Sequence, residues 1–213
     1  HKEYRRQRQM CIRDRHSASN VGAGHARDFA RMARSHILLQ ERGAGRRGSN
    51  MLIVFSGLPG TGKSTLAKAL ATHLQAVYLR IDSIEQALRD SGALRQDVDT
   101  SGYQVANIIA LDNLKAGLKV VADCVNPVSE SREVWADTAA RAGCRLVNVQ
   151  IICSDELQHR QRVESRVSDV PGLVVPDWQS VTAHEYEPWP HAPLTLDTCL
   201  LYTSPSPRDQ RGS

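Results

Sequence analysis

Residues 51–65 read MLIVFSGLPGTGKST, and this stretch decides the fold. An apolar run of strand length comes first, the pattern G-x-x-x-x-G-K-[ST] follows it, and a helix-prone segment comes next. A loop of this pattern between a strand and a helix is typical of a phosphate loop, whose backbone N–H groups surround the phosphates of a nucleotide. The stretch therefore predicts a nucleotide-binding protein, with a glycine turn that holds no ligand as the alternative.

Each residue type in the loop suits this task. Glycine has no Cβ, so the backbone can adopt positive φ and turn its N–H groups toward the β-phosphate. We expect the Lys63 ammonium to reach the β- and γ-phosphates, the Ser64 hydroxyl to hold Mg²⁺, and Thr65 to serve the α-phosphate. The residues predicted to bind the nucleotide are Gly57, Leu58, Pro59, Gly60, Thr61, Gly62, Lys63, Ser64 and Thr65.

The charge of the chain is unevenly distributed. The whole chain of 213 residues carries a net charge of +4, which first suggests a basic protein. Residues 1–50 hold 12 basic and 4 acidic side chains, whereas residues 51–198 hold 13 basic and 18 acidic ones, a net charge of −5. The basic surplus lies outside the segment that carries the loop, which argues against a nucleic-acid partner.

The two ends of the chain are related at the level of DNA. Residues 199–204 (CLLYTS) can be written in codons whose reverse complement encodes MCIRD, the sequence of residues 10–14. Residues 5–15 and 199–209 resemble the translation of a sequencing adapter with its flanks, so we exclude them from the fold as one would a fusion scar. A disordered basic arm and a Ser/Pro-rich tail are the alternative.

We therefore expect three parts. Residues 1–50 are interpreted as a non-native or disordered leader, residues 51–198 as one domain, and residues 199–213 as a disordered tail. Residues 16–50 are interpreted as translated DNA ahead of a start at Met51, with a genuine extension resembling an organellar transit peptide as the alternative. On this interpretation the domain is truncated at its C-terminal end, after Thr198.

Strand and helix signals alternate through residues 51–198. We expect strands at 51–56, 76–82, 119–125, 145–153 and 193–198, helices at 63–75, 83–92, 103–118, 129–143 and 154–166, a loop or lid at 168–179, and a short helical stretch to residue 186. Ser129 or Ser131 is expected to cap its helix. Buried strands that alternate with helices predict an α/β fold with a parallel sheet covered on both faces.

Targeting signals and cysteine usage together predict a cytoplasmic location for the protein. We find no internal repeat, signal peptide or membrane-spanning run in the sequence. Cys124, Cys144 and Cys153 form no C-x-x-C pair, which is typical of reduced, buried thiols in a cytosolic protein and argues against a cysteine metal site.

Two carboxylates fall where parallel strands are expected to end. Asp123 follows the apolar run 119–122, and a carboxylate at that position is suited to hold Mg²⁺ beside the phosphate loop. Asp82 ends the second expected strand and would lie at the same edge, where it can accept the proton of an acceptor hydroxyl. A loop or N-cap carboxylate is the alternative for Asp123, and an N-cap for Asp82.

Arginines form the third group of candidates. Arg160, Arg162 and Arg166 are expected on one helix, with Arg162 and Arg166 on the face of His159, and guanidinium groups suit the oxygens of a transferring phosphoryl group. Arg132 is a candidate to grip the acceptor. A solvated helix face is the alternative for each. Trp135, Trp178, Tyr186 and Trp189 are expected to pack in the core or lid, with stacking on a ligand as the alternative.

With these motifs in place, residues 51–198 resemble the P-loop kinases of small molecules, a group that includes gluconate kinase, adenylylsulfate kinase, chloramphenicol phosphotransferase and the zeta toxins. The resemblance rests on LIVFSGLPGTGKSTLAKALA, Asp82, VVAD at Asp123, the C-x₆-R-x-R-x₃-R run from Cys153 to Arg166, and EYEPW with LTLDT. It implies a three-layer P-loop NTPase fold with strand order 2-3-1-4-5, ATP with Mg²⁺, Asp82 as the acceptor-side base, and Arg162 or Arg166 as lid arginines.

One departure from the family concerns the acceptor. Relatives often carry an arginine within a helical turn of the acceptor-side aspartate, where this chain has Glu85. We therefore expect an acceptor that does not need that cation. The leading hypothesis is transfer of the γ-phosphoryl group of ATP to a hydroxyl of a small molecule. A nucleotide-binding ATPase module without such an acceptor, and a kinase of nucleic-acid 5′-hydroxyls, are the alternatives.

Overall fold

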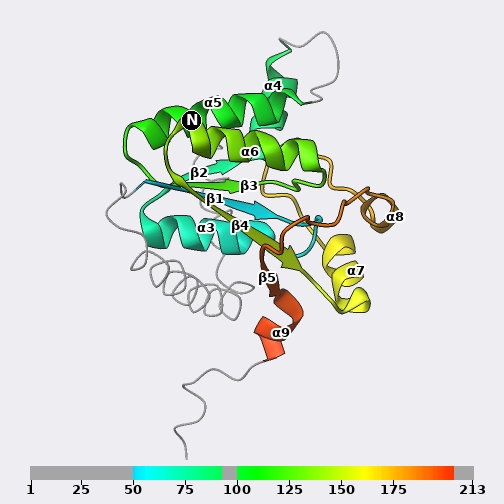
Figure 1. Cartoon of the computed structure of the whole chain (residues 1–213). Coiled ribbons are helices and arrows are strands. Elements are labelled where there is room, and N and C mark those ends of the chain that lie inside the picture. Colours follow the sequence, from blue (N-terminus) through cyan, green and yellow to red (C-terminus); the bar gives the residue numbers. More distant parts are fainter. Residues whose placement is uncertain (1–49, 93–99, 204–213) are drawn as a thin grey trace, which may run out of the picture.

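The computed structural model describes residues 50–92 and 100–203. The expectations for residues 1–49 and 204–213 lie outside these ranges. Five parallel strands form one sheet: β1 (Met51–Ser56), β2 (Val77–Arg80), β3 (Val120–Asp123), β4 (Arg145–Ile152) and β5 (Leu194–Asp197). Their order is β2-β3-β1-β4-β5, which confirms the expected topology. Figure 1 shows the central strand β1 between β3 and β4.

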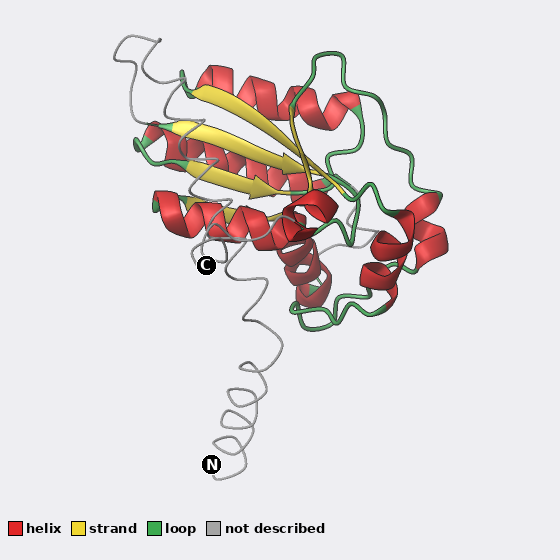
Figure 2. Ribbon diagram, turned by 90° about the horizontal axis from the view of Figure 1, so that it is seen from below, coloured by secondary structure: helices red, strands yellow, loops and turns green. Residues whose placement is uncertain are grey.

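Helices cover both faces of this sheet (Figures 1 and 2). They are α3 (Lys63–Leu74), α4 (Ile81–Ser91), α5 (Ser101–Lys115), α6 (Ser129–Arg141), α7 (Glu156–Glu164), α8 (Trp178–Thr182) and α9 (Thr198–Thr203). α3 packs on one face, and α5 with α6 on the other. Within the described ranges, no helix combines the length and the apolar character that crossing a membrane requires.

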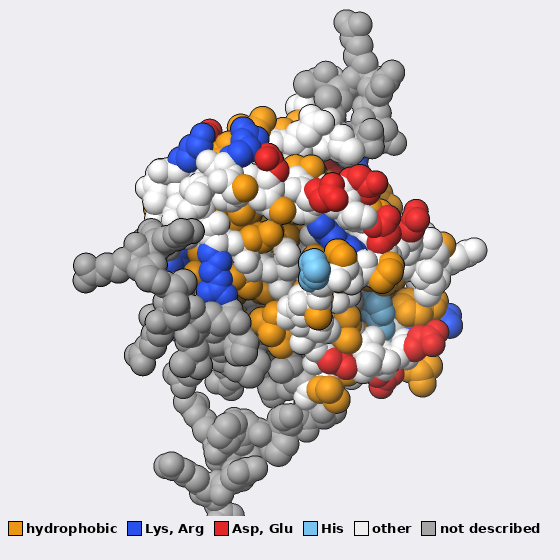
Figure 3. Space-filling view, viewed as in Figure 1, with side chains coloured by type: hydrophobic (Ala, Val, Ile, Leu, Met, Phe, Trp, Pro, Cys, Tyr) orange, Lys and Arg blue, Asp and Glu red, His pale blue; other side chains and the backbone are white. Residues whose placement is uncertain are grey.

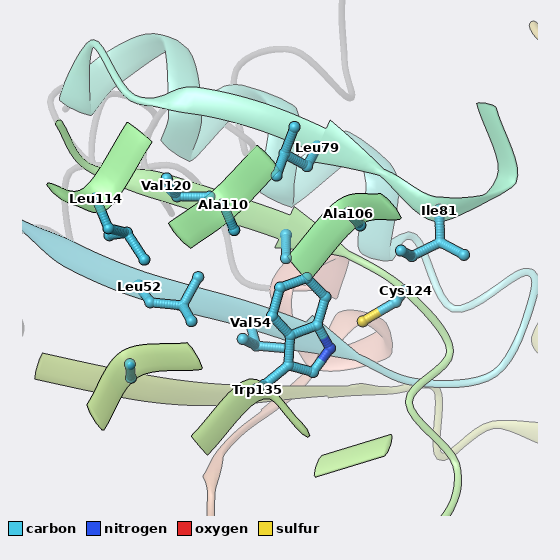
Figure 4. Packing of buried hydrophobic residues seen from close by; sticks show 12 residues of the cluster. Leu52, Val54, Leu79, Ile81, Ala106, Ala110, Leu114, Val120, Cys124 and Trp135 are labelled. Atoms are coloured by element: carbon cyan, nitrogen blue, oxygen red, sulfur yellow. The ribbon is translucent and has the colours of Figure 1, made fainter. Parts of the chain in front are cut away.

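Side chains of β1 point alternately to the two faces of the sheet and so contribute to both halves of the core. Ile53 and Phe55 point to the α3 side, whereas Leu52 and Val54 point to the side of α5 and α6. Trp135 of α6 is fully buried on the second side, where Figure 4 shows its indole ring beside Val54. Because β1 is covered on both faces, its sequence is a continuous apolar run.

All five strands are parallel, so their carboxyl ends meet at one edge of the sheet. The phosphate loop (residues 57–65) and the start of α4 follow these ends, and Asp123 is the last residue of β3. The opposite edge carries the turns into β3 and β4. These turns contain Gly117 (φ 85°) and Gly143 (φ 61°), and a Cβ on either would meet no atom within 4 Å.

Several expected boundaries were wrong. β2 ends at Arg80, so Asp82 lies in the first turn of α4 and not in the strand. α6 begins at Ser129 with Val128 as its N-cap and has no side-chain cap, because the Ser129 hydroxyl donates to Glu187 and the Ser131 hydroxyl to the Val128 carbonyl. The short helix expected to reach residue 186 ends at Thr182.

The C-terminal part of the described chain also differs from expectation. The tail expected to be disordered from residue 199 is helical through Thr203, in α9. The reason is local: the Asp197 carboxylate accepts a hydrogen bond from the Cys199 N–H at 3.0 Å and so supports the first turn. Of the three cysteines expected to be buried, only Cys124 is; Cys144 and Cys153 are partly exposed, and all are free thiols.

Candidate functional site

The phosphate loop has the backbone that its sequence predicts. Its glycines all have positive φ, including 82° at Gly60. α7 packs directly against this residue: a Cβ at Gly60 would lie 2.5 Å from Cγ2 of Val163, and the His159 ring approaches the same point. Nε2 of His159 lies 2.8 Å from the carbonyl oxygen of Pro59. The loop is therefore held between the end of β1 and α7, with no room for a side chain at Gly60.

This packing predicts the effect of Gly60→Ala. The substitution adds both backbone strain and a clash with Val163, so we expect a loss of roughly 2 to 4 kcal/mol in the free energy of unfolding. We also expect weaker ATP binding, because the loop must move. Gly117→Ala is the matched control, since φ is similar (85°) but the Cβ meets nothing within 4 Å. Chemical denaturation and ATP titration check both; equal losses in the two variants would contradict the argument.

The first catalytic candidates meet directly behind the loop. Lys63 Nζ lies 2.7 Å from Asp123 Oδ1, and both side chains are almost fully buried. The Tyr78 hydroxyl donates to Asp123 Oδ2 at 2.7 Å, and the Ser64 hydroxyl is near enough to help lower the pKa of the carboxylate. Burial alone would raise the pKa of Asp123, but the Lys63 ammonium and these hydroxyls outweigh it and hold that pKa below its ordinary value.

The donors at this point suit Mg²⁺. Ser64 and Asp123 bring a hydroxyl and an ionised carboxylate together, and oxygen ligands are those that Mg²⁺ prefers. Within residues 50–92 and 100–203, no group of three or more His, Cys, Asp or Glu side chains could hold a metal by itself. The two oxygen donors fit an ion whose other ligands are phosphate and water, as is usual for Mg²⁺ in phosphoryl-transfer sites.

Two cavities open on either side of Lys63. The larger, of about 910 Å³, is lined by residues 58–65 of the phosphate loop, by Tyr78 and Arg80 of β2, and by Arg162, Ser165, Arg166, Val167, Asp169 and Val170. The smaller, of about 390 Å³, is lined by Asp82 and neighbouring residues of α4, by Val125, and by residues 172–176. Lys63 and Arg166 line both cavities, so they stand where the two spaces meet.

The smaller cavity has a mixed lining. Glu85, Gln86 and Arg89 of α4 form one wall, and the apolar residues 173–176 form another. Glu85 pairs with Arg89 at 3.6 Å. Burial raises the pKa of Glu85 above its ordinary value, although the Arg89 guanidinium opposes this. Arg89, the cation of this wall, is thus paired with Glu85.

Asp82, the candidate for the acceptor side, lies among arginines. Asp82 Oδ2 is 3.4 Å from an Arg80 nitrogen and 4.0 Å from an Arg166 nitrogen, and the carboxylate is about one-third exposed. Its position in the first turn of α4 also suits the helix dipole. Asp82 therefore opens onto the smaller cavity while two guanidinium groups keep its charge compensated.

Arg162 and Arg166, the two arginines expected to belong to a lid, differ in their surroundings. Arg162 is on α7 and donates to the Thr198 hydroxyl at 2.7 Å and to Gln158 at 2.6 Å. α7 ends at Glu164, so the expectation that Arg166 shares the helix was wrong. Arg166 instead begins the connection to α8, residues 165–177, which contains no helix or strand and which we call the α7–α8 segment. Arg160 is exposed and pairs with Glu164.

Arg132 is not in this site. It is 7% exposed, lines neither cavity, and donates to the carbonyl oxygens of Asn126, Pro127, Glu187 and Pro188. Its guanidinium also stacks on the rings of Tyr186 and Trp189, at 5.3 and 4.1 Å from the ring centres. The structure thus gives Arg132 a structural contact in place of the expected acceptor role. The aromatic residues pack as expected, with Trp178 against His159 and Trp135 in the core.

These contacts predict the effect of Arg132→Met. We expect a loss of about 2 to 4 kcal/mol in the free energy of unfolding, because four carbonyl contacts and two ring contacts disappear. ATP affinity should stay within about twofold of wild type, because the residue lies outside the cavities. Arg141→Met is the control, since Arg141 is on the same helix and forms an exposed pair with Asp137. A change in ATP binding without a change in stability would contradict the assignment.

The sequence did not predict the site contacts of Tyr78, Arg80 and Asp169. Tyr78 and Arg80 alternate on one face of β2, and strand register places Arg80 beside Asp123. The alternation of polar residues at the end of a short strand was a signal for these two. Asp169 reaches Arg80 from 89 positions away, and no local pattern indicates that contact.

Known proteins are similar to this chain in sequence. A family model described as "AAA domain" matches residues 52–183. The adenylyl-sulfate kinase of Chloroflexus aurantiacus is 35% identical over 94 residues, which make up 39% of this chain and 48% of that protein. The adenylyl-sulfate kinase of Myxococcus xanthus is 29% identical over 110 residues, 49% of this chain and 59% of that protein. The chain thus spans about half the length of the curated relatives it matches.

Solved structures are similar in fold. A crystal structure from Chloroflexus aurantiacus gives a TM-score of 0.58 at 23% identity and covers 74% of this chain and 90% of that one. The Mycobacterium tuberculosis APS kinase CysC, solved with AMPPNP and APS, gives 0.51 at 19% identity and covers 71% and 90%. Both likenesses confirm the α/β P-loop fold predicted from the sequence.

Proposed function

From the premise that this chain belongs to the AAA domain family, we propose that it is an ATP-dependent kinase that transfers the γ-phosphoryl group to a hydroxyl of a small molecule. The observation that carries the proposal is the pair of cavities that meet at Lys63 and Arg166, with the phosphate loop in one and Asp82 in the other. The similarity to two adenylyl-sulfate kinases supports the same reaction class.

The phosphate side of the reaction follows from the loop. Its backbone N–H groups and the N-terminus of α3 bind the phosphates of ATP. Lys63 pairs with Asp123 in this structure, and its ammonium moves to the β- and γ-phosphates when ATP enters. Ser64 and Asp123 would hold Mg²⁺, which supplies positive charge to the phosphates when bound.

The acceptor side follows from the smaller cavity. Asp82 accepts the proton of the acceptor hydroxyl while the oxygen of that hydroxyl attacks the γ-phosphorus. The bond from the γ-phosphorus to the β-phosphate oxygen breaks, and ADP is released. Arg166, and Arg162 on the phosphate side, place guanidinium groups near the transferring group. The apolar residues 173–176 limit the water around it.

The surface supports a small acceptor over a nucleic acid. Residues 51–198 carry a net charge of −5. On the face in Figure 3, acidic side chains gather at the upper right, whereas the Lys and Arg side chains form no continuous stripe. A nucleic-acid groove needs a continuous basic surface, because phosphate contacts dominate that affinity.

A screen of metabolite-dependent ADP production tests the proposal. The purified chain is incubated with ATP, Mg²⁺ and pools of hydroxylated metabolites, and pools that raise ADP are resolved into single compounds. We expect at least one compound to raise ADP production at least about tenfold and to gain a phosphoryl group by mass spectrometry. ADP production that no compound changes would instead favour a nucleotide-binding ATPase module.

A further inference from the structure

Arg80 is a buried guanidinium group that faces three carboxylates. It ends β2, its side chain is 8% exposed, and it is paired in register with Asp123 of β3. Its terminal nitrogens lie 2.7 Å from Asp169 Oδ1 and 3.4 Å from Asp82 Oδ2. Its Nε lies 4.0 Å from Asp123 Oδ2 and, among the described residues, makes no hydrogen bond.

The three carboxylates belong to three different parts of the site. Asp82 opens onto the acceptor cavity, Asp123 lies behind the phosphate loop, and Asp169 is in the α7–α8 segment. A buried charge is costly unless it is paired, so the guanidinium keeps this arrangement only while its partners stay in place. Arg80 therefore joins three elements that are distant in sequence.

The contact with Asp169 fixes the segment that carries Arg166. Asp169 is 69% exposed, and the hydrogen bond from Arg80 is the first cause of its lowered pKa. Arg166 lies three residues earlier and lines both cavities. When Asp169 is held, the start of the α7–α8 segment is held with it, and so is the backbone of Arg166.

We propose that Arg80 is a positioning residue: it orients the Asp82 carboxylate toward the acceptor cavity and, through Asp169, fastens the α7–α8 segment beside the two cavities. This inference rests on the proposed role of Asp82 as the acceptor-side base. Arg80 does not touch the reacting atoms. Its guanidinium works because a planar fork can contact two carboxylates at once, which an ammonium cannot do in the same way.

Hydrogen exchange of the α7–α8 segment tests the fastening. Asp169→Asn removes the charge of an exposed side chain, so the variant should fold, and we expect residues 165–177 to exchange about fivefold faster or more. Asp137→Asn is the matched control, because Asp137 is 63% exposed and also pairs with an arginine. Exchange within about twofold of wild type in Asp169→Asn would overturn the proposal.

Arg80→Lys tests the second part of the proposal, that Arg80 orients the Asp82 carboxylate. The variant keeps the positive charge but loses the planar guanidinium fork. We therefore expect kcat for phosphoryl transfer to fall about tenfold. The affinity for ATP, measured in the presence of a metal chelator, should stay within about twofold of wild type. Combining it with Asp169→Asn should add little further exchange, because both changes weaken the same contact, the charged hydrogen bond between Arg80 and Asp169. Equal losses in kcat and ATP affinity in Arg80→Lys would show that Arg80 has a purely structural role. Increases in hydrogen exchange that add up in the double variant would show the same.

The two proposals fail in different ways. If wild type transfers no phosphoryl group to any acceptor, the proposed kinase function is wrong. The exchange of residues 165–177 in Asp169→Asn still decides whether Arg80 fastens the segment, since that measurement requires no acceptor. If wild type transfers but Arg80→Lys has an unchanged kcat, the positioning of Asp82 by Arg80 is wrong and the kinase function stands.

Discussion

Lys63→Ala is expected to weaken ATP binding about 100-fold and to reduce phosphoryl transfer below detection. The ammonium is the phosphate-loop cation and it stands at the junction of the two cavities, so its loss affects both binding and the transferring group. Isothermal titration with ATP and an ADP-production assay measure the two effects. A folded variant that binds ATP like wild type would contradict the assignment of the loop.

The fold of this variant needs its own check, because the change leaves Asp123 buried beside fewer cations. Breaking a buried ion pair from one side commonly costs about 3 to 5 kcal/mol. Lys63→Arg keeps the charge next to Asp123 and is expected to restore stability without restoring transfer, since a guanidinium differs in shape and reach. Lys115→Ala, at an exposed position of α5, is the control for removing a lysine and should change neither quantity.

Asp82→Asn is expected to separate binding from chemistry. The amide has nearly the same shape and can still accept a hydrogen bond from Arg80, so ATP affinity should stay within about twofold of wild type. Transfer should fall about 100- to 1,000-fold, because the amide does not accept the proton of the acceptor hydroxyl. The comparison uses ATP titration together with the rate of acceptor phosphorylation.

Asp112→Asn provides the matched control for this variant. Asp112 is exposed on α5, lines neither cavity and should tolerate the change without loss of transfer. If Asp82→Asn transfers at the wild-type rate, Asp82 is not the base, and its carboxylate serves only α4 and the neighbouring arginines. Loss of ATP binding in the same variant would instead place Asp82 on the nucleotide side.

The features that the sequence predicts best are local or periodic. The phosphate loop is continuous in sequence, and its glycines need positive φ for reasons that act within a few residues. The buried strands are recognisable because parallel strands are apolar on both faces. Asp82 and Asp123 could be proposed as site residues because Asp123 ends β3 and Asp82 lies two positions after β2, and strand ends meet at one edge.

The features that the sequence did not predict depend on contacts between distant segments. Arg132 resembles any helix arginine until residues 186–189 cover it. The cap expected from Ser129 is absent because Glu187, 58 positions away, binds its hydroxyl and N–H. Arg80 and Asp169 form a pair that only the folded chain brings together. These contacts depend on tertiary packing, which overrides the local preference of each residue.

The two ends of the sheet differ in how well they suit the attachment of a label. Gly117 and Gly143 lie in turns at the amino ends of β3 and β4, with open space around them. Every candidate for the chemistry follows the carboxyl ends instead. A fluorophore, an affinity handle or an inserted peptide is therefore best attached in these turns, where it can report on the protein without obstructing ligand entry.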